Sequence, residues 1–426
     1  MNDPIESLQR SVRSLTEELL TVYEMLHLLQ SLGPRLGRLG GEDQILAAAL
    51  AEALETVQAD CGWVALWDGD QPRAPAVRGL DRAAAEHISQ AALAPLHFRN
   101  KRFVLSHAFA EEHGLAPETA PQRFLAGALA ASGASFGYLC AGRRSGGRNF
   151  TSADQKLLTA VASLLAVELE NARLRRAEME KARLETELEL ASSFQRSLQP
   201  RDFGCCGFLE ADGLSVPCQQ VGGDYFDLLP MSDEACLLVI ADVFGKGPAA
   251  AMQAAMLQGL VHATSRHCRQ VGCLLDILNG CLRARACAGS YVTAFLAIVD
   301  RCGGLRYING GHHPPLWIRR DGTVLQLSEG GPLVGWLEHP HYEEGAVELA
   351  PGDTVLLYTD GVTEAANPSG ETFGAARLLE WAARQAGASP SQIRTGLLRA
   401  VEEFSGGRPN DDDLALLAVR FTGAPR

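Results

Sequence analysis

A stretch without glycine or proline, residues 151–199, most constrains the fold of this chain. Thr151 is a good helix cap, Asp154 stands three residues later, and apolar residues then recur at helical spacing. A continuous helix over this stretch would be roughly 70 Å long at ~1.5 Å per residue. It ends at Pro200. The sequence therefore predicts a long helix that joins a first folded part to a second.

The later half of this helix carries a heptad pattern, typical of a coiled coil. Lys181 and Gln195 interrupt the pattern, and such breaks weaken a coiled coil. A weakened coiled-coil contact is compatible with a helix that changes its conformation. The apolar positions are Leu174, Ala177, Leu184, Leu188, Ala191 and Leu198.

The N-terminal segment, residues 1–33, carries a stricter heptad. The apolar heptad residues form a narrow stripe along the helix. A narrow stripe favours a coiled coil between two copies of the chain, and hence a homodimer. The alternative is a single amphipathic helix packed on its own domain. We expect Gly33-Pro34 to end this helix. The heptad residues are Leu8, Val12, Leu15, Leu19, Val22, Leu26 and Leu29.

Composition excludes some functions. The chain has 426 residues, a globular apolar fraction of 46% and a net charge of -13, which argues against binding nucleic acid. No apolar run reaches the ~18 residues that cross a bilayer, and the N-terminus does not resemble a signal peptide. We therefore expect a cytoplasmic protein without membrane contact.

The chain contains 11 cysteines, and these are expected to be free thiols in the core.

The segment between the two heptads alternates helical and strand-like stretches. Residues 42–57 have helical spacing, residues 61–67 and 136–141 read as strands, and residues 142–147 read as a loop. The stretch FGYLCAGRRSGGRNFTSADQKLLTAVASLLAVELENARL resembles the C-terminal end of a GAF domain. This resemblance implies a sensor for an unidentified small molecule or partner. A GAF domain that only dimerises is the alternative.

Four groups of aspartates stand beside apolar, strand-like stretches in residues 201–426. They contain Asp224, Asp242, Asp360 and the run Asp411–Asp413. Aspartates that gather at strand ends repel one another unless cations neutralise them, and hard oxygen ligands select Mg²⁺ or Mn²⁺. A single Asp-Gly is usually only a turn, but four such groups predict a magnesium-type site.

Motifs in this region indicate which class of protein contains the predicted magnesium-type site. The sequence contains, in this order, GGDYFD, DVFGKG, YVTAF, NGGHHPPLW, GPLVG, LYTDGVTEA and DDLALLAVR. It resembles the SpoIIE/RsbU-type branch of the metal-dependent (PPM) serine/threonine protein phosphatases over nearly all of residues 190–425. The preceding ELASSFQRSLQP looks like the switch segment of that branch.

The resemblance implies site residues by position. Asp242 would bridge two Mn²⁺ or Mg²⁺ ions, with Asp224 and the carbonyl of Val243 completing one of them. Asp360 and Asp412 would hold the other ion. The same four aspartates would be the catalytic residues, because the ions activate the attacking water. Asp227 is expected to be a supporting or structural acid, and the roles of Asp411 and Asp413 stay open.

Other residues near the motifs have two possible roles each. Lys246 is expected either to contact phosphate or to be a solvated charge. His312 and His313 stand before two prolines, where a structural histidine is favoured over a general acid. Phe244 and Ala415 depart from the usual serine and threonine of the branch.

The resemblance implies an α+β fold, the PPM αββα sandwich of two antiparallel sheets flanked by helices. The expected domains are a coiled-coil helix (1–33), a GAF-like α/β sensor (35–168), a coiled-coil linker or switch helix (169–200) and the phosphatase (201–426). The implied reaction is hydrolysis of phosphoserine or phosphothreonine on a partner, a phosphorylated STAS-domain anti-sigma-factor antagonist, by metal-activated water in a partner-switching pathway. The alternatives are a non-catalytic dimeric sensor and a phosphatase of small phosphate esters.

Overall fold

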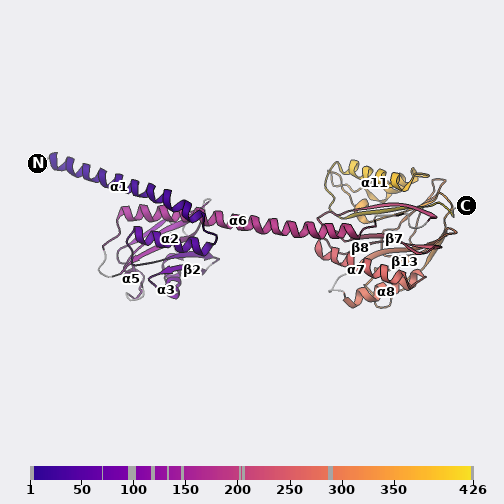
Figure 1. Ribbon diagram of the computed structural model, residues 1–426, viewed down its shortest axis with the longest axis horizontal. Coiled ribbons are helices and arrows are strands. Elements are labelled where there is room, and N and C mark those ends of the chain that lie inside the picture. Colours follow the sequence, from indigo (N-terminus) through magenta and orange to yellow (C-terminus); the bar gives the residue numbers. More distant parts are fainter. Residues whose placement is uncertain are drawn as a thin grey trace. The chain divides into compact units, whose positions relative to one another are not determined.

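The chain forms two compact units, Met1–Ala182 and Arg183–Arg426, in a computed structural model (Figure 1). The structure describes residues 4–69, 71–94, 102–116, 120–131, 134–144, 148–200, 203, 207–285 and 291–423. Among these residues, no helix combines the length and apolarity needed to span a membrane.

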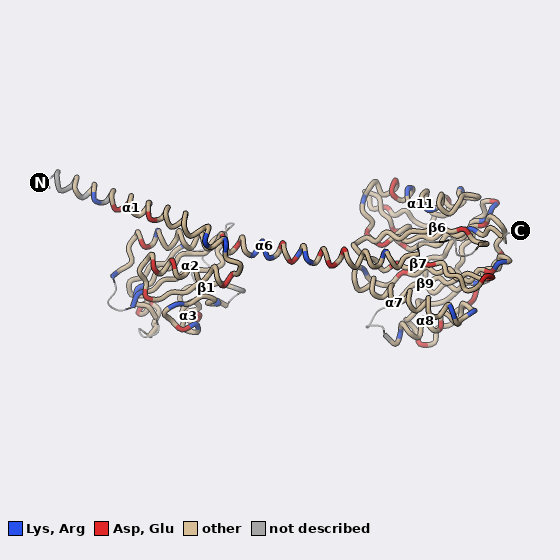
Figure 2. Tube along the Cα trace, in the orientation of Figure 1, with Lys and Arg blue, Asp and Glu red and all other residues tan. Residues whose placement is uncertain are grey.

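The long helix α6 runs without a break over Ser152–Leu198, which confirms the prediction of a continuous helix. Its first half buries apolar side chains in the first unit, including Leu158 and Leu165. Acidic and basic residues alternate along its middle (Figure 2). Mixed charge of this kind keeps a helix solvated where no core covers it.

The first unit is built on one antiparallel sheet of five strands in the order β2-β1-β5-β4-β3. Side chains alternate between its two faces, as β geometry requires. Val64 and Leu66 face α1, α2 and α6, whereas Trp63 and Ala65 face α3, η1 and α5. The elements are α1 (Pro4–Gly37), α2 (Glu42–Thr56), β1 (Cys61–Asp68), β2 (Gln71–Arg78), α3 (Arg82–Ile88), η1 (Ser89–Leu93), β3 (Phe103–Ser106), α5 (Phe109–Glu112), β4 (Arg123–Ala131) and β5 (Ala134–Arg143).

The end of the first helix was wrongly predicted. The helix α1 passes through Pro34 and continues to Gly37. Gly33 has no Cβ to clash with the proline ring, and Leu32 and Leu36 are completely buried against the core. Burial of these two leucines outweighs the hydrogen bond that proline removes.

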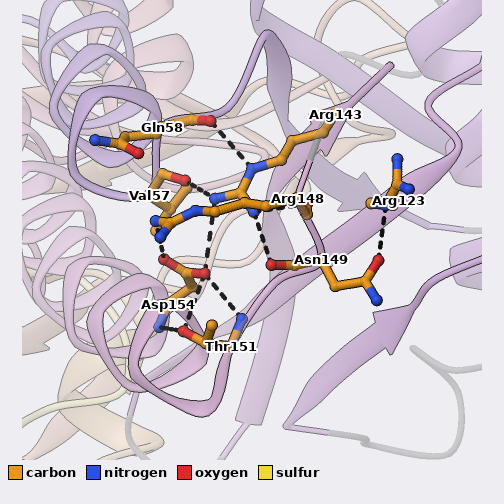
Figure 3. A network of polar contacts seen from close by, with 8 residues as sticks. All are labelled: Val57, Gln58, Arg123, Arg143, Arg148, Asn149, Thr151 and Asp154. Carbon is orange, nitrogen blue, oxygen red and sulfur yellow. Dashed lines mark hydrogen bonds and ion pairs between the residues drawn. The ribbon is translucent and has the colours of Figure 1, made fainter. Parts of the chain in front are cut away.

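A buried polar network joins α2, β5 and the start of α6 (Figure 3). Arg143 is 2% exposed, and its guanidinium lies 3.6 Å from the Asp154 carboxylate and stacks 4.0 Å from the centre of the Phe150 ring. Its N–H groups also donate to backbone carbonyls on both sides. The acceptors are the carbonyl oxygens of Val57, Gln58, Arg148 and Asn149.

Asp154 in turn accepts from the backbone N–H and the hydroxyl of Thr151, so it caps α6 from inside. The network therefore fixes the point where α6 leaves the sheet of the first unit.

The second unit is a sandwich of two mainly antiparallel sheets with helices on both outer faces. One sheet has the order β13-β10-β9-β8-β7, with β14 also paired to β10; the other has the order β12-β11-β15-β16-β6. Apolar side chains from both sheets, such as Leu238 and Leu417, form the central core. The helices α7 and α8 cover the first sheet, and α10 and α11 cover the second.

This arrangement is the αββα sandwich expected from the sequence. Strands run as β6 (Leu209–Val216), β7 (Asp224–Ser232), β8 (Ala235–Val243), β9 (Val292–Asp300), β10 (Gly304–Gly310), β11 (Leu316–Ile318), β12 (Val324–Gln326), β13 (Gly330–Gly331), β14 (Gly345–Glu348), β15 (Thr354–Tyr358) and β16 (Leu414–Phe421). Helices run as α7 (Pro248–Ser265), α8 (Val271–Arg285), α9 (Asp360–Thr363), α10 (Gly374–Ala383) and α11 (Pro390–Ser405).

The expectation that all cysteines are free core thiols is wrong. Cys268 and Cys273 are joined as a disulfide, because the turn between α7 and α8 brings their Cα atoms to 6.0 Å. Cys302 is a free thiol but is exposed. Cys61 and Cys140 match the expectation, since both are free and completely buried.

Candidate metal centre

The paired strands β7 and β8 bring the first two aspartates together. Asp224 begins β7, Asp242 lies near the end of β8, and the antiparallel register sets them directly opposite each other. Both share the even-numbered face of their strands with Phe226 and Ile240, which point into the core between the sheets. The two carboxylates therefore lie on the inner face of the sandwich, at one edge.

The second sheet contributes the other two aspartates. The strands β15 and β16 pair with Tyr358 opposite Leu416, so Asp360, just after β15, and Asp412, just before β16, fall at the same edge. One oxygen each of Asp360, Glu364 and Asp412 lies within 4.8 Å of the others.

Glu364 was missed from the sequence. It lies one helical turn after Asp360, and this four-residue spacing, which brings both side chains to one face, is the signal that could have found it.

The charges of the four aspartates act on one another, as expected for residues of one site. Burial raises the pKa of Asp242 to about 7, and the nearby carboxylates of Asp360 and Asp412 add to this. Burial and then the charge of Asp242 raise the pKa of Asp224 well above its usual value. The pKa of Asp360 is raised by burial and by Asp412. The structure therefore brings together all four aspartates singled out by sequence.

The Asp224 carboxylate is held on one side only. Its Oδ2 accepts a 2.7 Å hydrogen bond from the Thr359 hydroxyl, which itself accepts from the backbone N–H of Ala415. Its Oδ1 is buried and has no hydrogen-bond partner within the described part of the chain. An ionised oxygen in that position is costly unless a cation binds it. Thr359, a second residue missed from the sequence, orients this carboxylate.

The carbonyl of Val243 lies beside the same strand end. A Cβ on Gly223 would meet the Val243 oxygen at 2.9 Å, and a Cβ on Gly222 would meet the Asp413 carboxylate at 2.5 Å. Only glycine permits these close approaches, so the two glycines let the chain pass between Asp413 and Val243 on its way to Asp224.

The residues present fit a pair of hard divalent cations. The donors are carboxylates and a backbone carbonyl, the type of ligand that Mg²⁺ and Mn²⁺ prefer. Buried carboxylates with raised pKa values, one of them with an unpartnered oxygen, are stabilised in their ionised form by bound cations.

The neighbouring residues Asp411 and Asp413 make other contacts. Asp413 is buried and accepts from the backbone N–H groups of Cys218 and Gly223 at 2.8 and 2.6 Å. Asp411 is exposed and forms an ion pair with Arg408 at 2.7 Å. The Lys246 ammonium contacts Asp412 at 2.9 Å, so this lysine reaches the acidic cluster.

Asp227 lies apart from this cluster. It stands three residues after Asp224 and therefore points to the opposite face of β7, toward α7. Its carboxylate contacts His262 Nε2 at 2.7 Å and accepts from the Tyr225 hydroxyl at 3.1 Å.

His312 is structural. It is buried, with Nδ1 2.8 Å from the Thr293 hydroxyl and Nε2 3.1 Å from the Tyr358 carbonyl. Since a carbonyl only accepts, Nε2 carries the proton and Nδ1 accepts from the hydroxyl. Burial lowers the pKa of His312 to about 3, so at neutral pH it is not a protonated acid. His313 is less buried than His312.

Two sandwiched antiparallel sheets with a carboxylate-rich centre at one edge define a class, the PP2C-type metal-dependent phosphatase fold. The model for Stage II sporulation protein E (SpoIIE) matches residues 232–422, and the model for the GAF domain matches residues 41–170. The chain therefore carries a SpoIIE-type phosphatase domain, which is preceded by a GAF domain.

Individual relatives agree. Protein IcfG from Synechocystis sp. is 28% identical over 222 residues, which is 46% of this chain and 35% of that protein. Phosphoserine phosphatase RsbU from Bacillus subtilis is 29% identical over 192 residues, 44% of this chain and 56% of RsbU. The matches thus span about half or less of these curated relatives. The SiaA-PP2C domain of Pseudomonas aeruginosa shares the fold at 23% identity and a TM-score of 0.52, covering 57% of this chain and 98% of the domain.

Proposed function

We propose that the chain is a metal-dependent serine/threonine protein phosphatase. The observation that carries this proposal is the meeting of four aspartates from four separate segments, namely Asp224, Asp242, Asp360 and Asp412. Burial and the charges of neighbouring carboxylates raise the pKa values of the first three. Phosphatase activity in the relative RsbU, stated in its name, supports the same reaction class.

The proposed roles are those that the family resemblance implies. Asp242, which lies opposite Asp224 and is influenced by the charges of Asp360 and Asp412, would be shared by two cations. Asp224 and the Val243 carbonyl would hold one cation, while Asp360, Asp412 and Glu364 would hold the other. Bound Mn²⁺ or Mg²⁺ would supply an activated water and neutralise phosphate charge. Thr359 keeps the Asp224 carboxylate oriented.

A protein substrate is favoured over a small phosphate ester by the surroundings of the centre. Phe244 directly follows Val243, and its ring lies 4.6 Å from that of Tyr291, which lies 5.3 Å from that of Trp336. Phe244 and Trp336 are each 57% exposed. Exposed aromatic side chains are typical of protein contact surfaces. We propose a phosphorylated STAS-domain anti-sigma-factor antagonist as the partner, as the family resemblance implies.

A homodimer is proposed from the exposed stripe of α1. Its heptad residues Leu8, Leu15 and Leu19 are all more than half exposed, at 68%, 62% and 66%. A second copy would cover them in a coiled coil. The chain mass is 45.6 kDa, so sedimentation equilibrium of the full chain should give about twice this value. Replacing Leu15 and Leu19 with glutamate should shift it to the monomer, and a monomeric wild type would exclude the dimer.

Regulation is proposed to run from the GAF domain through α6. In the first unit, Trp63, Phe109 and Phe124 are completely buried and stacked between the sheet and its helices, with ring centres 5.5 and 4.1 Å apart. This dense packing favours dimerisation and transmission through α6 over binding of a small molecule at that face. The cytoplasmic location remains a prediction from the sequence.

The proposed reaction can be tested directly with the full chain. Phosphate release from a phosphoserine-containing STAS protein should need Mn²⁺ or Mg²⁺, stop with EDTA and return when metal is added in excess. Small esters such as p-nitrophenyl phosphate should be hydrolysed with a kcat/KM at least about tenfold lower, since they lack the contacts of a protein surface. Metal-independent hydrolysis, or none with any phosphoprotein, would contradict the proposal.

A further inference from the structure

Two motifs of the sequence, YVTAF and GPLVG, supply no residue to the proposed metal centre, but they meet the segment that leaves it. The backbone N–H of Phe244 donates to the carbonyl of Tyr291, the first residue of YVTAF, at 3.1 Å. Val292 and Val334 exchange two backbone hydrogen bonds of 3.0 and 2.9 Å, which tie YVTAF to the end of GPLVG. Three segments far apart in the chain are therefore joined through their backbones.

These three segments place three aromatic rings in a row. The ring centre of Tyr291 lies 4.6 Å from that of Phe244 and 5.3 Å from that of Trp336, which is contact distance for aromatic pairs. The two outer side chains remain 57% exposed. We refer to the three side chains as the aromatic surface. At one end it is joined to the proposed metal centre, because the backbone nitrogen of Phe244 is bonded to the carbonyl carbon of Val243.

The turn that carries Trp336 is held by a buried amide. Asn279 of α8 is 4% exposed, and its Oδ1 accepts from the N–H of Gly335 at 2.7 Å, while its Nδ2 donates to the carbonyl of Leu337 at 3.0 Å. Gly335 has a φ of 88°, which suits glycine, and a Cβ there would meet the Cβ of Leu282 at 3.0 Å. Trp336 is thus exposed on a turn that is fixed before and after it, so its exposure is a property of the fold.

The position of the aromatic surface decides what can cover it. A phosphoserine whose phosphate reaches the metal centre brings the neighbouring residues of its own chain to the surface beside that centre. Three successive rings at these spacings extend over roughly 10 Å, the length of about three residues of extended chain at ~3.3 Å per residue. The side chain that covers the aromatic surface therefore lies within about three positions of the phosphoserine.

The chemistry of the aromatic surface favours an apolar side chain. Aromatic faces in water are stabilised when an aliphatic or aromatic group covers them. Leu337, the residue after Trp336, is also exposed, at 44%, and extends the apolar composition of the turn. Glu338 is paired with Arg283 at 3.6 Å, so its charge is offset and offers little to a cationic side chain.

We propose that the aromatic surface of Phe244, Tyr291 and Trp336 determines substrate specificity by binding an apolar side chain within about three positions of the phosphoserine. This inference rests on the proposed function and specifies which phosphoproteins the same site accepts. A phosphoserine with an apolar neighbour gains binding free energy from the aromatic surface in addition to the contacts of its phosphate. A phosphoserine with only polar neighbours reaches the cations without that gain.

The test measures kcat/KM of the full chain with Mn²⁺ on phosphoserine peptides that differ at one position. The probes are alanine-rich heptapeptides with a central phosphoserine, in which leucine, glutamine or arginine stands at each flanking position in turn. The wild type should prefer leucine over glutamine about tenfold at one of these positions, through a lower KM, because leucine buries apolar surface there. Phe244→Ser and Trp336→Ser should each reduce this preference to below about twofold. A ratio of two peptides on one protein cancels any general change in activity.

Leu325→Ser is the matched control, because Leu325 of β12 is an exposed apolar residue (43%) outside the aromatic surface, and it should keep the tenfold preference. Equal kcat/KM for all peptides would overturn the inference, as would a leucine preference that survives in both variants or a preference for arginine at the same position.

Peptide binding separates this inference from the proposed function. If no peptide is hydrolysed, polarisation of the same peptides labelled with fluorescein replaces kcat/KM, and equal affinities for the leucine and glutamine peptides would overturn the inference. If the phosphoserine STAS protein is not hydrolysed either, the proposed function is refuted, while the binding comparison still decides whether the aromatic surface selects an apolar side chain.

Discussion

Replacing Asp360 with asparagine is expected to lower phosphate release from a phosphoserine protein by roughly a thousandfold, since a lost cation ligand removes several kcal/mol of transition-state stabilisation. Asparagine keeps the size of the side chain and one oxygen but not the charge. Asp360 lies within 4.8 Å of Glu364 and Asp412, measured between ligand oxygens, so its charge contributes to any cation held there.

The same substitution should not destabilise the metal-free protein. Burial and the charges of Asp412 and Glu364 raise the pKa of Asp360, so its ionised form is disfavoured in the fold. Removing that charge relieves repulsion, and the melting temperature without metal should stay equal or rise. Binding of the phosphoprotein should also persist, because contacts away from the acids are unchanged.

Asp411→Asn is the matched control for this experiment. Asp411 is exposed and pairs with Arg408, so its loss should leave activity within about twofold and stability nearly unchanged. Phosphate release, partner binding and thermal melting are measured on all three proteins. Full activity of Asp360→Asn would eliminate the proposed metal centre, and a wild type that binds the phosphoprotein without hydrolysing it would support the non-catalytic sensor.

Replacing Arg143 with methionine is expected to lower the free energy of unfolding of the first unit by about 3–5 kcal/mol, the cost of breaking a buried ion pair by removing one partner. The change leaves the buried Asp154 carboxylate with Arg148, whose side chain is largely exposed, as its remaining ion-pair partner. It also leaves the carbonyls of Val57 and Gln58 without the guanidinium that binds them. The start of α6 should then become mobile.

Arg148→Met provides the comparison, because Arg148 contacts the same carboxylate at 3.5 Å but its side chain is 59% exposed. Its loss should cost less than about 1 kcal/mol. Denaturant-dependent hydrogen exchange of the β1 and β5 amides reports on the first unit alone and measures both variants. Equal stabilities for the two variants would show that the buried network contributes little.

Most of the helices and strands could be predicted because the sequence signals that define them are local. Helical spacing without glycine or proline predicted α6, and strand-like stretches predicted β1 and β5 within a few residues. The end of α1 was missed because Pro34 is a strong local signal, whereas the burial of Leu32 and Leu36 that overrides it depends on distant residues.

Some residues of the candidate site could likewise be predicted from the sequence, and others could not. Aspartates beside apolar strands and glycines are visible in the sequence, and the seven motifs assign them to a family. Thr359 and Glu364 carry weaker local signals. Their importance follows from contacts with Asp224 and Asp412, which lie 135 and 48 positions away in the chain.

By itself, the sequence determined the elements and the acids, because periodicity, turn residues and motifs act over short stretches of chain. Tertiary structure alone decided that β7 pairs with β8 in the register that sets Asp224 against Asp242, and that β15 and β16 end at the same edge. It also decided that Gln195 contacts Gly222. Register and side-chain contact depend on how two sheets and a helix pack, and that packing is set by the whole core at once.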